Sequence, residues 1–92
     1  MTKYRLSPEE KDDLVWIYNY GITQFGQAHA DLYLSELLNC FEHIVKNPNQ
    51  YPSVNHIVAG YHRCVHKADS IYFRVNTNTV EIMAVIGRQD FG

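Results

Sequence analysis

Three side chains that often take part in chemistry lie close together in the sequence: His62, Cys64 and His66. In an extended strand, positions four residues apart are separated by about 13 Å, too far for two imidazoles to share one ion at bonds of about 2 Å. No neighbouring residue is of a type that would orient a histidine as the base for a Cys64 nucleophile. We therefore expect Cys64 to be a small buried side chain. We predict no metal, no cofactor and no catalytic residue.

Arginines form a second group with a possible chemical role. Arg63, Arg74 and Arg88 come from three different predicted strands or strand ends, and Lys67 lies at a turn. A guanidinium binds phosphates and carboxylates through paired hydrogen bonds, so arginines that converge on an open sheet face suit an anionic partner. The alternative is that these are ordinary solvated arginines on separate strands.

Aromatic residues form a third group. Trp16 and Tyr20 are one helical turn apart and lie off the apolar stripe of their predicted helix, while Tyr33 comes from the next helix. Aromatic rings are common at protein interfaces, so a strip of this kind could receive a partner. The alternative is that the rings pack against the loop or the edge of the sheet.

The composition describes the setting of these residues. The chain has 92 residues, of which 46% are hydrophobic, so we expect one packed domain spanning residues 1–92. The net charge of −2 is too balanced to predict nucleic-acid binding by the whole chain, although residues 56–92 carry +1 and residues 1–55 carry −3.

The cellular setting is also predicted from the sequence. The N-terminus lacks the apolar segment of a signal peptide, and no apolar run approaches the roughly 18–20 residues that span a bilayer. We expect a cytoplasmic protein without membrane contact or a small-molecule substrate. Cys40 and Cys64 are expected to be reduced, with one disulfide between them as the alternative.

The order of secondary-structure signals is strand, helix, helix, loop and three strands. Ser7 can cap a helix that starts at Pro8, and Glu10 completes a capping box. Gly26 favours the end of this helix, and Pro48 ends the second one. The expected elements are a strand at 3–6, helices before and after Gly26 that end by residue 46, a loop at 47–60 with a helical turn near 54–58, and strands at 61–66, 70–75 and 80–86.

Periodicity assigns the faces of these elements. The predicted apolar face of the first helix consists of Leu14, Ile17, Tyr18, Gly21 and Phe25. The predicted stripe of the second helix consists of Ala30, Leu34, Leu37, Leu38, Phe41, Ile44 and Val45. Strand alternation places Ile71, Phe73 and Val75 opposite Tyr72 and Arg74, and groups Val80, Ile82, Ala84 and Ile86 on one face. We predict an α+β fold, in which an N-terminal strand and an antiparallel helical hairpin pack on one face of a small, mainly antiparallel sheet whose other face stays partly open.

The same order of elements is similar to that of the RelE/ParE toxins. The segments that carry the resemblance cover nearly the whole chain and are individually short. They are Tyr4-Arg5-Leu6-Ser7-Pro8-Glu9, Gln24-Phe25-Gly26, Ala30-Asp31-Leu32-Tyr33, Asn47-Pro48, Gly60-Tyr61-His62-Arg63, Ser70-Ile71-Tyr72-Phe73-Arg74-Val75, Val80-Glu81-Ile82 and Ile86-Gly87-Arg88-Gln89-Asp90. Their order along the chain resembles the ParE branch in particular.

The resemblance implies a function. ParE toxins are the poison half of type II toxin–antitoxin pairs that stabilise plasmids; they poison DNA gyrase and are neutralised by the antitoxin ParD. We therefore expect a gyrase inhibitor without catalysis of its own, with a ParD-like antitoxin and DNA gyrase as partners, and contact with operator DNA only through the antitoxin complex. The alternative is a ribosome-dependent mRNA endonuclease of the RelE type, and a third possibility is a harmless member that only binds its antitoxin.

Departures from the RelE pattern favour the gyrase inhibitor over the mRNA endonuclease. Residues 47–62 contain no lysine or arginine, and Phe91 in the tail has no proton to transfer, although His62 and His66 could supply acid–base chemistry. Two other positions depart from the ParE pattern, Cys64 and Ser70. The candidate residues for toxicity are Arg63, Arg74, Arg88, Gln89 and Asp90. The candidate residues for antitoxin binding are Trp16, Tyr20, Tyr33, Arg63 and Arg74.

Overall fold

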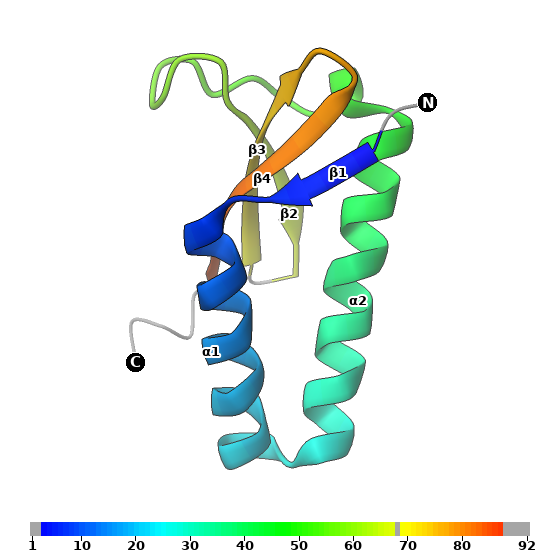
Figure 1. Cartoon of the computed structure of the whole chain (residues 1–92), viewed down its shortest axis with the longest axis vertical. Helices are drawn as coiled ribbons and strands as arrows, with labels where there is room; N and C mark the ends of the chain where they lie inside the picture. The colour runs from blue at the N-terminus through cyan, green and yellow to red at the C-terminus, as the bar shows by residue number, and fades with distance from the viewer. Residues whose placement is uncertain (1–2, 68, 88–92) are drawn as a thin grey trace.

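A computed structural model describes residues 3–67 and 69–87 (Figure 1). Its elements are β1 (Lys3–Leu6), α1 (Pro8–Phe25), α2 (Gln27–Lys46), the 3-10 helix η1 (Pro48–Gln50), β2 (His62–His66), β3 (Asp69–Asn76) and β4 (Thr79–Gly87). The predicted strand, helical hairpin and three closing strands are therefore confirmed. The helical turn expected near 54–58 is a hydrogen-bonded turn from Val54, and the 3-10 helix lies earlier. Arg88, Gln89 and Asp90 lie outside the described residues.

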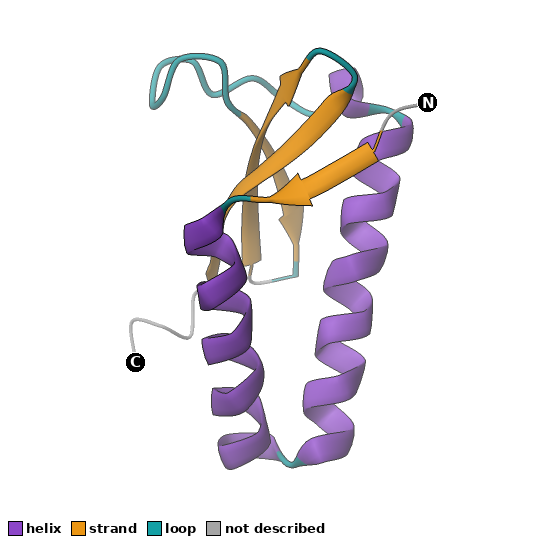
Figure 2. Cartoon of the chain, in the orientation of Figure 1, coloured by secondary structure: helices purple, strands orange, loops and turns teal. Residues whose placement is uncertain are grey.

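The four strands form one sheet in the order β1-β4-β3-β2 (Figure 2). The β2–β3 and β3–β4 pairs are antiparallel, whereas β1 lies parallel to β4. The long connection that a parallel pair requires runs through the helical hairpin and then through β2 and β3. The sheet is therefore mixed and mainly antiparallel, as predicted, and β1 and β4 come together although they stand at opposite ends of the sequence.

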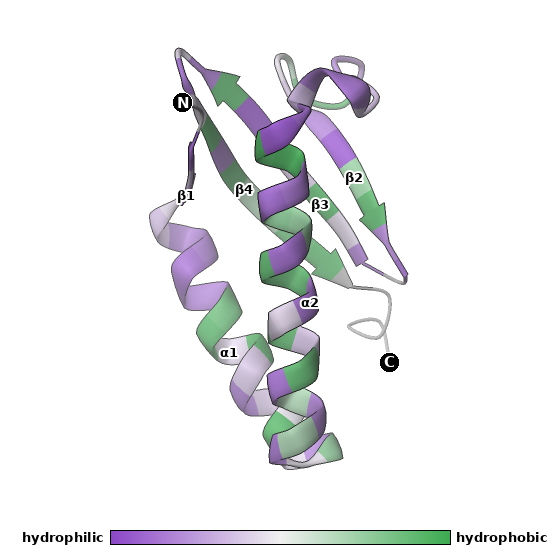
Figure 3. Cartoon of the chain, turned by 90° about the vertical axis from the view of Figure 1, so that its right-hand side faces the viewer, coloured by the Kyte–Doolittle hydropathy of each residue, from purple (hydrophilic) through white to green (hydrophobic). Residues whose placement is uncertain are grey.

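The core lies between one face of the sheet and α2, which crosses that face (Figure 3). Helix α2 contributes Leu37, Phe41 and Ile44, each fully buried. The sheet contributes Ile71 and Phe73 from β3, with Val80, Ile82 and Val85 from β4. The predicted stripe of α2 is thus confirmed at its centre, while Leu38 is 38% exposed at its margin.

A β-bulge changes the phase of β4. Tyr72 pairs with Ala84 but the next residue, Phe73, pairs with Ile82, so Met83 is an extra residue on β4. Val85 consequently faces the core, and Ile86 is 45% exposed. The expectation that Val80, Ile82, Ala84 and Ile86 share one face was wrong beyond Ile82. Val75, also expected inside, is 41% exposed near the end of β3.

Helix α1 touches the core only near its start. Of the expected apolar face, only Leu14 is buried, and Phe25 is 64% exposed. The reason is that the hairpin extends past the end of the sheet, so the second half of α1 packs only on α2 (Figure 1). The two helices approach closely where Gly21 faces Ala30, since a Cβ at Gly21 would lie 3.4 Å from the Ala30 Cβ.

Only one of the two hydrogen bonds of the predicted capping box forms at the start of α1. The Ser7 hydroxyl accepts a hydrogen bond from the Glu10 amide at 3.1 Å. The Glu10 carboxylate does not return to the Ser7 amide, which instead donates to the Ile82 carbonyl. Glu10 is fully buried, and its Oε1 accepts a hydrogen bond from the Val85 amide at 3.1 Å. The capping box is therefore half formed, and Glu10 joins α1 to β4 where β1 has ended.

Candidate functional site

The sheet face that points away from the helices is called the outer face here, and a row of three charged residues crosses it. Arg5 on β1 and Arg74 on β3 both pair in register with Glu81 on β4. Arg5 donates through Nε and Nη2 to Glu81 Oε2, and Arg74 donates through Nε to Glu81 Oε1 at 2.7 Å. The Arg5 side chain is 66% exposed and that of Arg74 is 47% exposed, whereas the Glu81 side chain is 7% exposed. Both guanidinium groups are thus fixed by one buried carboxylate.

This arrangement favours the ionised forms of Glu81 and Arg74. Hydrogen bonds from Arg5 and then Arg74 lower the pKa of Glu81, and the hydrogen bond to Glu81 raises the pKa of Arg74. Arg74 therefore already has a counter-ion within the chain, Glu81, which the sequence analysis did not identify. The sequence analysis did not identify Arg5, since its role depends on the pairing of β1 with a strand more than 70 residues away.

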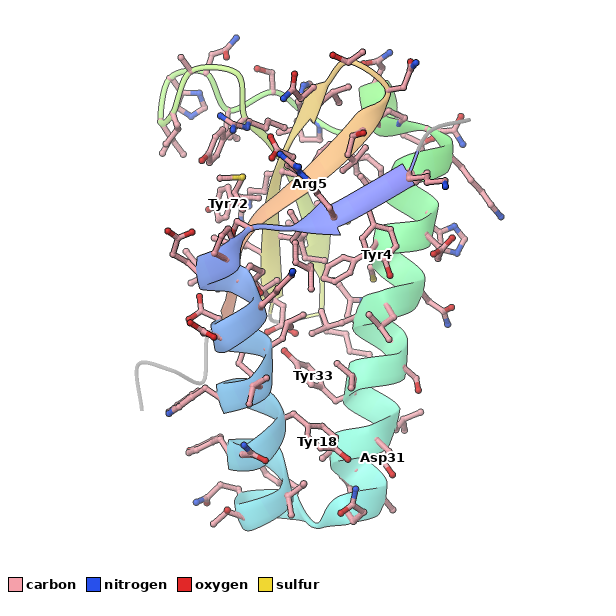
Figure 4. The ribbon with its side chains drawn as sticks, in the orientation of Figure 1. Tyr4, Arg5, Tyr18, Asp31, Tyr33 and Tyr72 are labelled. Atoms are coloured by element: carbon pink, nitrogen blue, oxygen red, sulfur yellow. The ribbon has the colours of Figure 1, made fainter. Side chains whose placement is uncertain are left out.

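Arg63 lies on the same outer face, one strand further on. It pairs in register with Tyr72, and its Nε donates a hydrogen bond to the Ser70 hydroxyl at 3.2 Å. Tyr72 lies on this face as well, away from the helices (Figure 4). The predicted placement of Arg63 and Arg74 on the face away from the helices is confirmed, with Tyr72 between them, and Arg88 lies outside the described residues.

A hollow of about 420 Å³ lies beside the charged row, where β1 leads into α1. Arg5, Arg74 and Lys11 bring positive charge to it, and Glu9 and Glu81 bring negative charge. The lining of this hollow therefore has three cations and two carboxylates, a net charge of +1, and one of the carboxylates, Glu81, is bonded to both arginines.

The helical hairpin carries a second surface. The rings of Trp16 and Tyr20 stack, with centroids 5.2 Å apart and planes 10° apart. Trp16 is 59% exposed and Tyr20 is 40% exposed. The two rings pack on each other, and Trp16 keeps more than half of its surface exposed and accessible to a partner.

Tyr33 differs from the other two aromatic candidates. It is partly buried, and its hydroxyl donates to Asp69 Oδ2 at 2.7 Å, which joins α2 to β3 (Figure 4). Asp69 is itself only 2% exposed. Tyr33 therefore serves to hold the helix on the sheet, a role that the sequence analysis did not anticipate.

A smaller hollow of about 220 Å³ lies between the two helices. It is mainly apolar and is lined by Ile17, Tyr18, Tyr20, Gly21, Phe25, His29, Ala30 and Tyr33. Beside it the Tyr18 hydroxyl donates a hydrogen bond to Asp31 (Figure 4). The Gln27 amide donates to both the Tyr18 hydroxyl and Asp31. The hydrogen bond to Asp31 raises the pKa of Tyr18. Neither Tyr18 nor Gln27 was a candidate from the sequence, because only the hairpin geometry brings them to Asp31.

His62, Cys64 and His66 of β2 lie on the inner face of the sheet. His62 stacks on Phe73 with ring centroids 5.4 Å apart, and His66 Nε2 lies 3.5 Å from Glu36 Oε1. Cys64 is buried, as predicted, and burial raises the pKa of its thiol, which disfavours the nucleophilic thiolate. Across residues 3–67 and 69–87, no three His, Cys, Asp or Glu side chains are grouped as metal ligands would be.

The architecture defines the chain as a protein of RelE/ParE-like fold. A solved structure described as the chromosomal ParDE TA system from P. aeruginosa matches it with a TM-score of 0.79, at 20% identity over 95% of each chain. A family model described as "ParE toxin of type II toxin-antitoxin system, parDE" matches residues 4–90. Toxin ParE1 of Caulobacter vibrioides is 34% identical over 86 residues, which cover 94% of this chain and 88% of that protein. The chain belongs to the ParE toxin family of type II toxin–antitoxin systems. Within the parts of the chain that the structure describes, no helix is both long and apolar enough to cross a bilayer.

Proposed function

We propose that this ParE-family toxin inhibits DNA gyrase without catalysis of its own and is neutralised by direct binding of a ParD-like antitoxin. Membership of the family and the likeness to a ParDE system support a ParD-like partner. The observation that carries the proposal is the separation of two surfaces. One is the exposed aromatic pair Trp16 and Tyr20 on the hairpin. The other is the basic outer face of the sheet, whereas His62 and His66 lie on the inner face. The first surface suits a protein partner, and the second binds anions without an imidazole for acid–base chemistry.

Purified toxin is expected to inhibit supercoiling by gyrase or to trap cleaved DNA on the enzyme. The assay should compare toxin alone with toxin saturated by its antitoxin, which should restore supercoiling. If gyrase is unaffected at a large molar excess of folded toxin, gyrase is not the target.

One observation favours a second candidate function, ribosome-dependent cleavage of mRNA. Tyr72 bears an ionisable hydroxyl and lies between Arg63 and Arg74 on the outer face. Primer extension on translated mRNA would detect such cleavage. Codon-phased cuts that disappear in Tyr72→Phe would establish the nuclease in place of gyrase inhibition.

The hairpin is proposed to receive a helix of the antitoxin. The exposed Trp16–Tyr20 stack lies next to the apolar hollow between α1 and α2, and Tyr20 belongs to both. An amphipathic partner helix can place apolar side chains along such a groove. Aromatic anchors of this size usually dominate the binding energy of an interface.

Trp16→Ala is therefore expected to weaken antitoxin binding by more than about 1 kcal/mol, roughly a fivefold rise in Kd. Titration calorimetry with purified antitoxin measures the change. Val15→Ala is the matched control, because Val15 is 61% exposed on the same helix but projects about 100° away around the helix axis. An unchanged Kd for folded Trp16→Ala would remove Trp16 from the interface.

The outer face is proposed to be the surface used against the target, and acidic groups of the antitoxin are proposed to occupy it in the neutralised complex. Arg63→Ala and Arg74→Ala on this face, and Arg88→Ala, which follows β4 in the sequence, should therefore each reduce toxicity. Growth after induction without antitoxin is the readout, with circular dichroism as the folding control. Full toxicity of all three folded variants would place the killing surface elsewhere, with the hairpin as the next candidate.

A further inference from the structure

The two cysteines of the chain lie on elements that face each other across the core. Cys40 is on α2, Cys64 is on the inner face of the edge strand β2, and both are free thiols. Both side chains pack in the same hydrophobic cluster, where Cys64 is buried and Cys40 is partly exposed. The proposed function uses neither of them.

The contacts next to the cysteines set the register of α2 against β2. Glu36 of α2 approaches His66 of β2, with Oε1 and Nε2 3.5 Å apart, and the same carboxylate oxygen accepts a hydrogen bond from Lys67 at 2.9 Å. Tyr33 lies one turn earlier in α2 and donates its hydrogen bond to Asp69, which comes later in the chain. Helix α2 therefore runs antiparallel to β2 along the inner face of the sheet.

Cys40 and Cys64 follow at the next step of this register. Cys40 comes four residues after Glu36 on the same side of α2, a rise of about 6 Å along the helix. Cys64 comes two residues before His66 on the same face of β2, a distance of about 6.6 Å along the strand. The two thiols are therefore opposite each other, which is the placement that a disulfide between a helix and a strand requires.

Tyr51 lies beside both thiols and supports their proximity. Its hydroxyl makes a hydrogen bond to the Cys64 sulfur. Burial, followed by the charges of Cys64 and Cys40, raises the pKa of Tyr51. Burial, followed by the charge of Cys64, raises the pKa of Cys40. Cys40, Tyr51 and Cys64 thus form one cluster between α2 and β2.

We propose that Cys40 and Cys64 form an intramolecular disulfide when the thiol pool around the toxin becomes oxidised, and that this bond stabilises the toxin in the absence of its antitoxin. The bond would join α2 to the edge strand β2 and close the loop of residues 40–64, which restricts the unfolded chain. A toxin without its antitoxin lacks the stabilisation that a bound partner provides, so a covalent link has its largest effect in that state. The proposal does not depend on gyrase being the target.

The oxidant that the reaction needs is a low-molecular-weight disulfide such as oxidised glutathione. Cys40 is the more exposed thiol and reacts first: its thiolate attacks one sulfur of the oxidant, forms a mixed disulfide and releases one glutathione thiolate. The Cys64 thiolate then attacks the Cys40 sulfur, forms the new disulfide and releases the second glutathione thiolate. Two electrons pass from the protein thiols to the oxidant, and the two thiol protons end on the released glutathione. Because burial raises the pKa of both cysteines, the reaction should be slow at neutral pH and faster as the pH rises.

The test uses the full-length toxin, which is first reduced and then equilibrated with oxidised glutathione. Intact-mass measurement should show a monomer that has lost two hydrogens, and peptide mapping should link Cys40 to Cys64. Cys64→Ala should stop at the mixed disulfide on Cys40, whereas Cys40→Ala should stay unmodified, because Cys64 is only 7% exposed. A wild type that keeps glutathione on Cys40, or that forms disulfides only between chains, would overturn the proposal.

Guanidinium chloride denaturation of the oxidised and the reduced wild type measures the effect of the bond on stability. Oxidation should lower the ratio of unfolded to folded toxin by on the order of a hundredfold. Cys40→Ala taken through the same treatment is the control and should show no change. Equal stability of the linked and reduced wild type would overturn the stabilising role. Neither measurement contains gyrase or antitoxin, so failure here is distinct from failure of the proposed function.

Discussion

Phe41→Ala is expected to lower the free energy of unfolding by about 3–5 kcal/mol, the largest loss that we expect from a single substitution in this chain. Phe41 is fully buried on α2, and its ring contacts Tyr4 of β1 with centroids 5.5 Å apart. Truncation would remove the packing between α2 and β1 and leave a cavity that the surrounding sheet cannot close. A domain of this size is commonly stable by only about 5–15 kcal/mol, so the free variant would be marginal.

Guanidinium chloride denaturation of the free toxin measures this loss. Phe25→Ala is the matched control, since Phe25 is the same residue type but 64% exposed at the tip of the hairpin, where surface changes are usually within about 0.5 kcal/mol. The antitoxin should partly rescue Phe41→Ala, because a partner at 1,000 times its Kd stabilises the folded state by about 4 kcal/mol. A loss below about 1 kcal/mol would show that Phe41 is not packed as described.

Local signals in the sequence were sufficient to predict the secondary structure. Ser7 and Pro8 define the start of α1, Gly26 lies at the corner between the helices with a φ of 91°, and Pro48 follows the end of α2. Each of these effects acts within a few residues, through capping or through the allowed backbone angles. That is why the element order could be predicted without tertiary contacts.

Contacts between distant segments could not be predicted in the same way. The bulge at Met83 reverses the face of every later residue in β4, and no residue type marks it in the sequence. Arg5 and Glu81 are 76 positions apart, so their bond requires the parallel pairing of β1 with β4. Nothing in the sequence distinguishes the partly buried Tyr33 from the exposed candidates Trp16 and Tyr20, and its hydrogen bond to Asp69 is seen only in the fold.

The charged outer face could be predicted only in part, because one of its contacts joins two different strands. Alternation alone placed Arg74 opposite the core residues Ile71 and Phe73, and the structure confirms this. Alternation could not give the counter-ion, because Glu81 acts across a strand boundary. A chain with a net charge of −2 therefore brings Arg5, Arg63 and Arg74 together on one face only when the strands are paired.

Glu10→Gln is expected to remove most of the decline in stability between pH 5 and pH 8. Burial, followed by the nearby charge of Asp13, raises the pKa of Glu10 from 4.5 to about 7, while the hydrogen bond from the Val85 amide opposes this shift. Oε1 accepts that bond, but Oε2 is buried without a partner. An ionised Glu10 would therefore leave a poorly compensated charge at the junction of α1 and β4.

The sign of the effect follows from proton linkage. A carboxyl whose folded-state pKa lies above its unfolded value holds its proton more tightly when folded, so its stabilising contribution is complete below about pH 4.5. That contribution declines as the pH rises and is fully lost above about pH 7, with a total of about 3 kcal/mol. Glu36 and Glu81 have lowered pKa values, so their contributions change below pH 4.5 and do not mask this window.

Denaturation curves at several pH values, for the wild type and Glu10→Gln, test this directly. The wild type should lose stability from pH 5 to pH 8, and Glu10→Gln should be nearly flat, because glutamine keeps an oxygen for the Val85 amide without a charge. Glu9→Gln is the control, since Glu9 is the exposed neighbour in the same first turn and should retain the wild-type decline. Glu10 and Leu14 are the only buried residues of α1, so the ionisation of Glu10 should loosen this helix before the rest of the fold. Hydrogen exchange along α1 should therefore accelerate above pH 7 in the wild type and not in Glu10→Gln. A wild-type decline that persists in Glu10→Gln would show that another group controls the pH dependence.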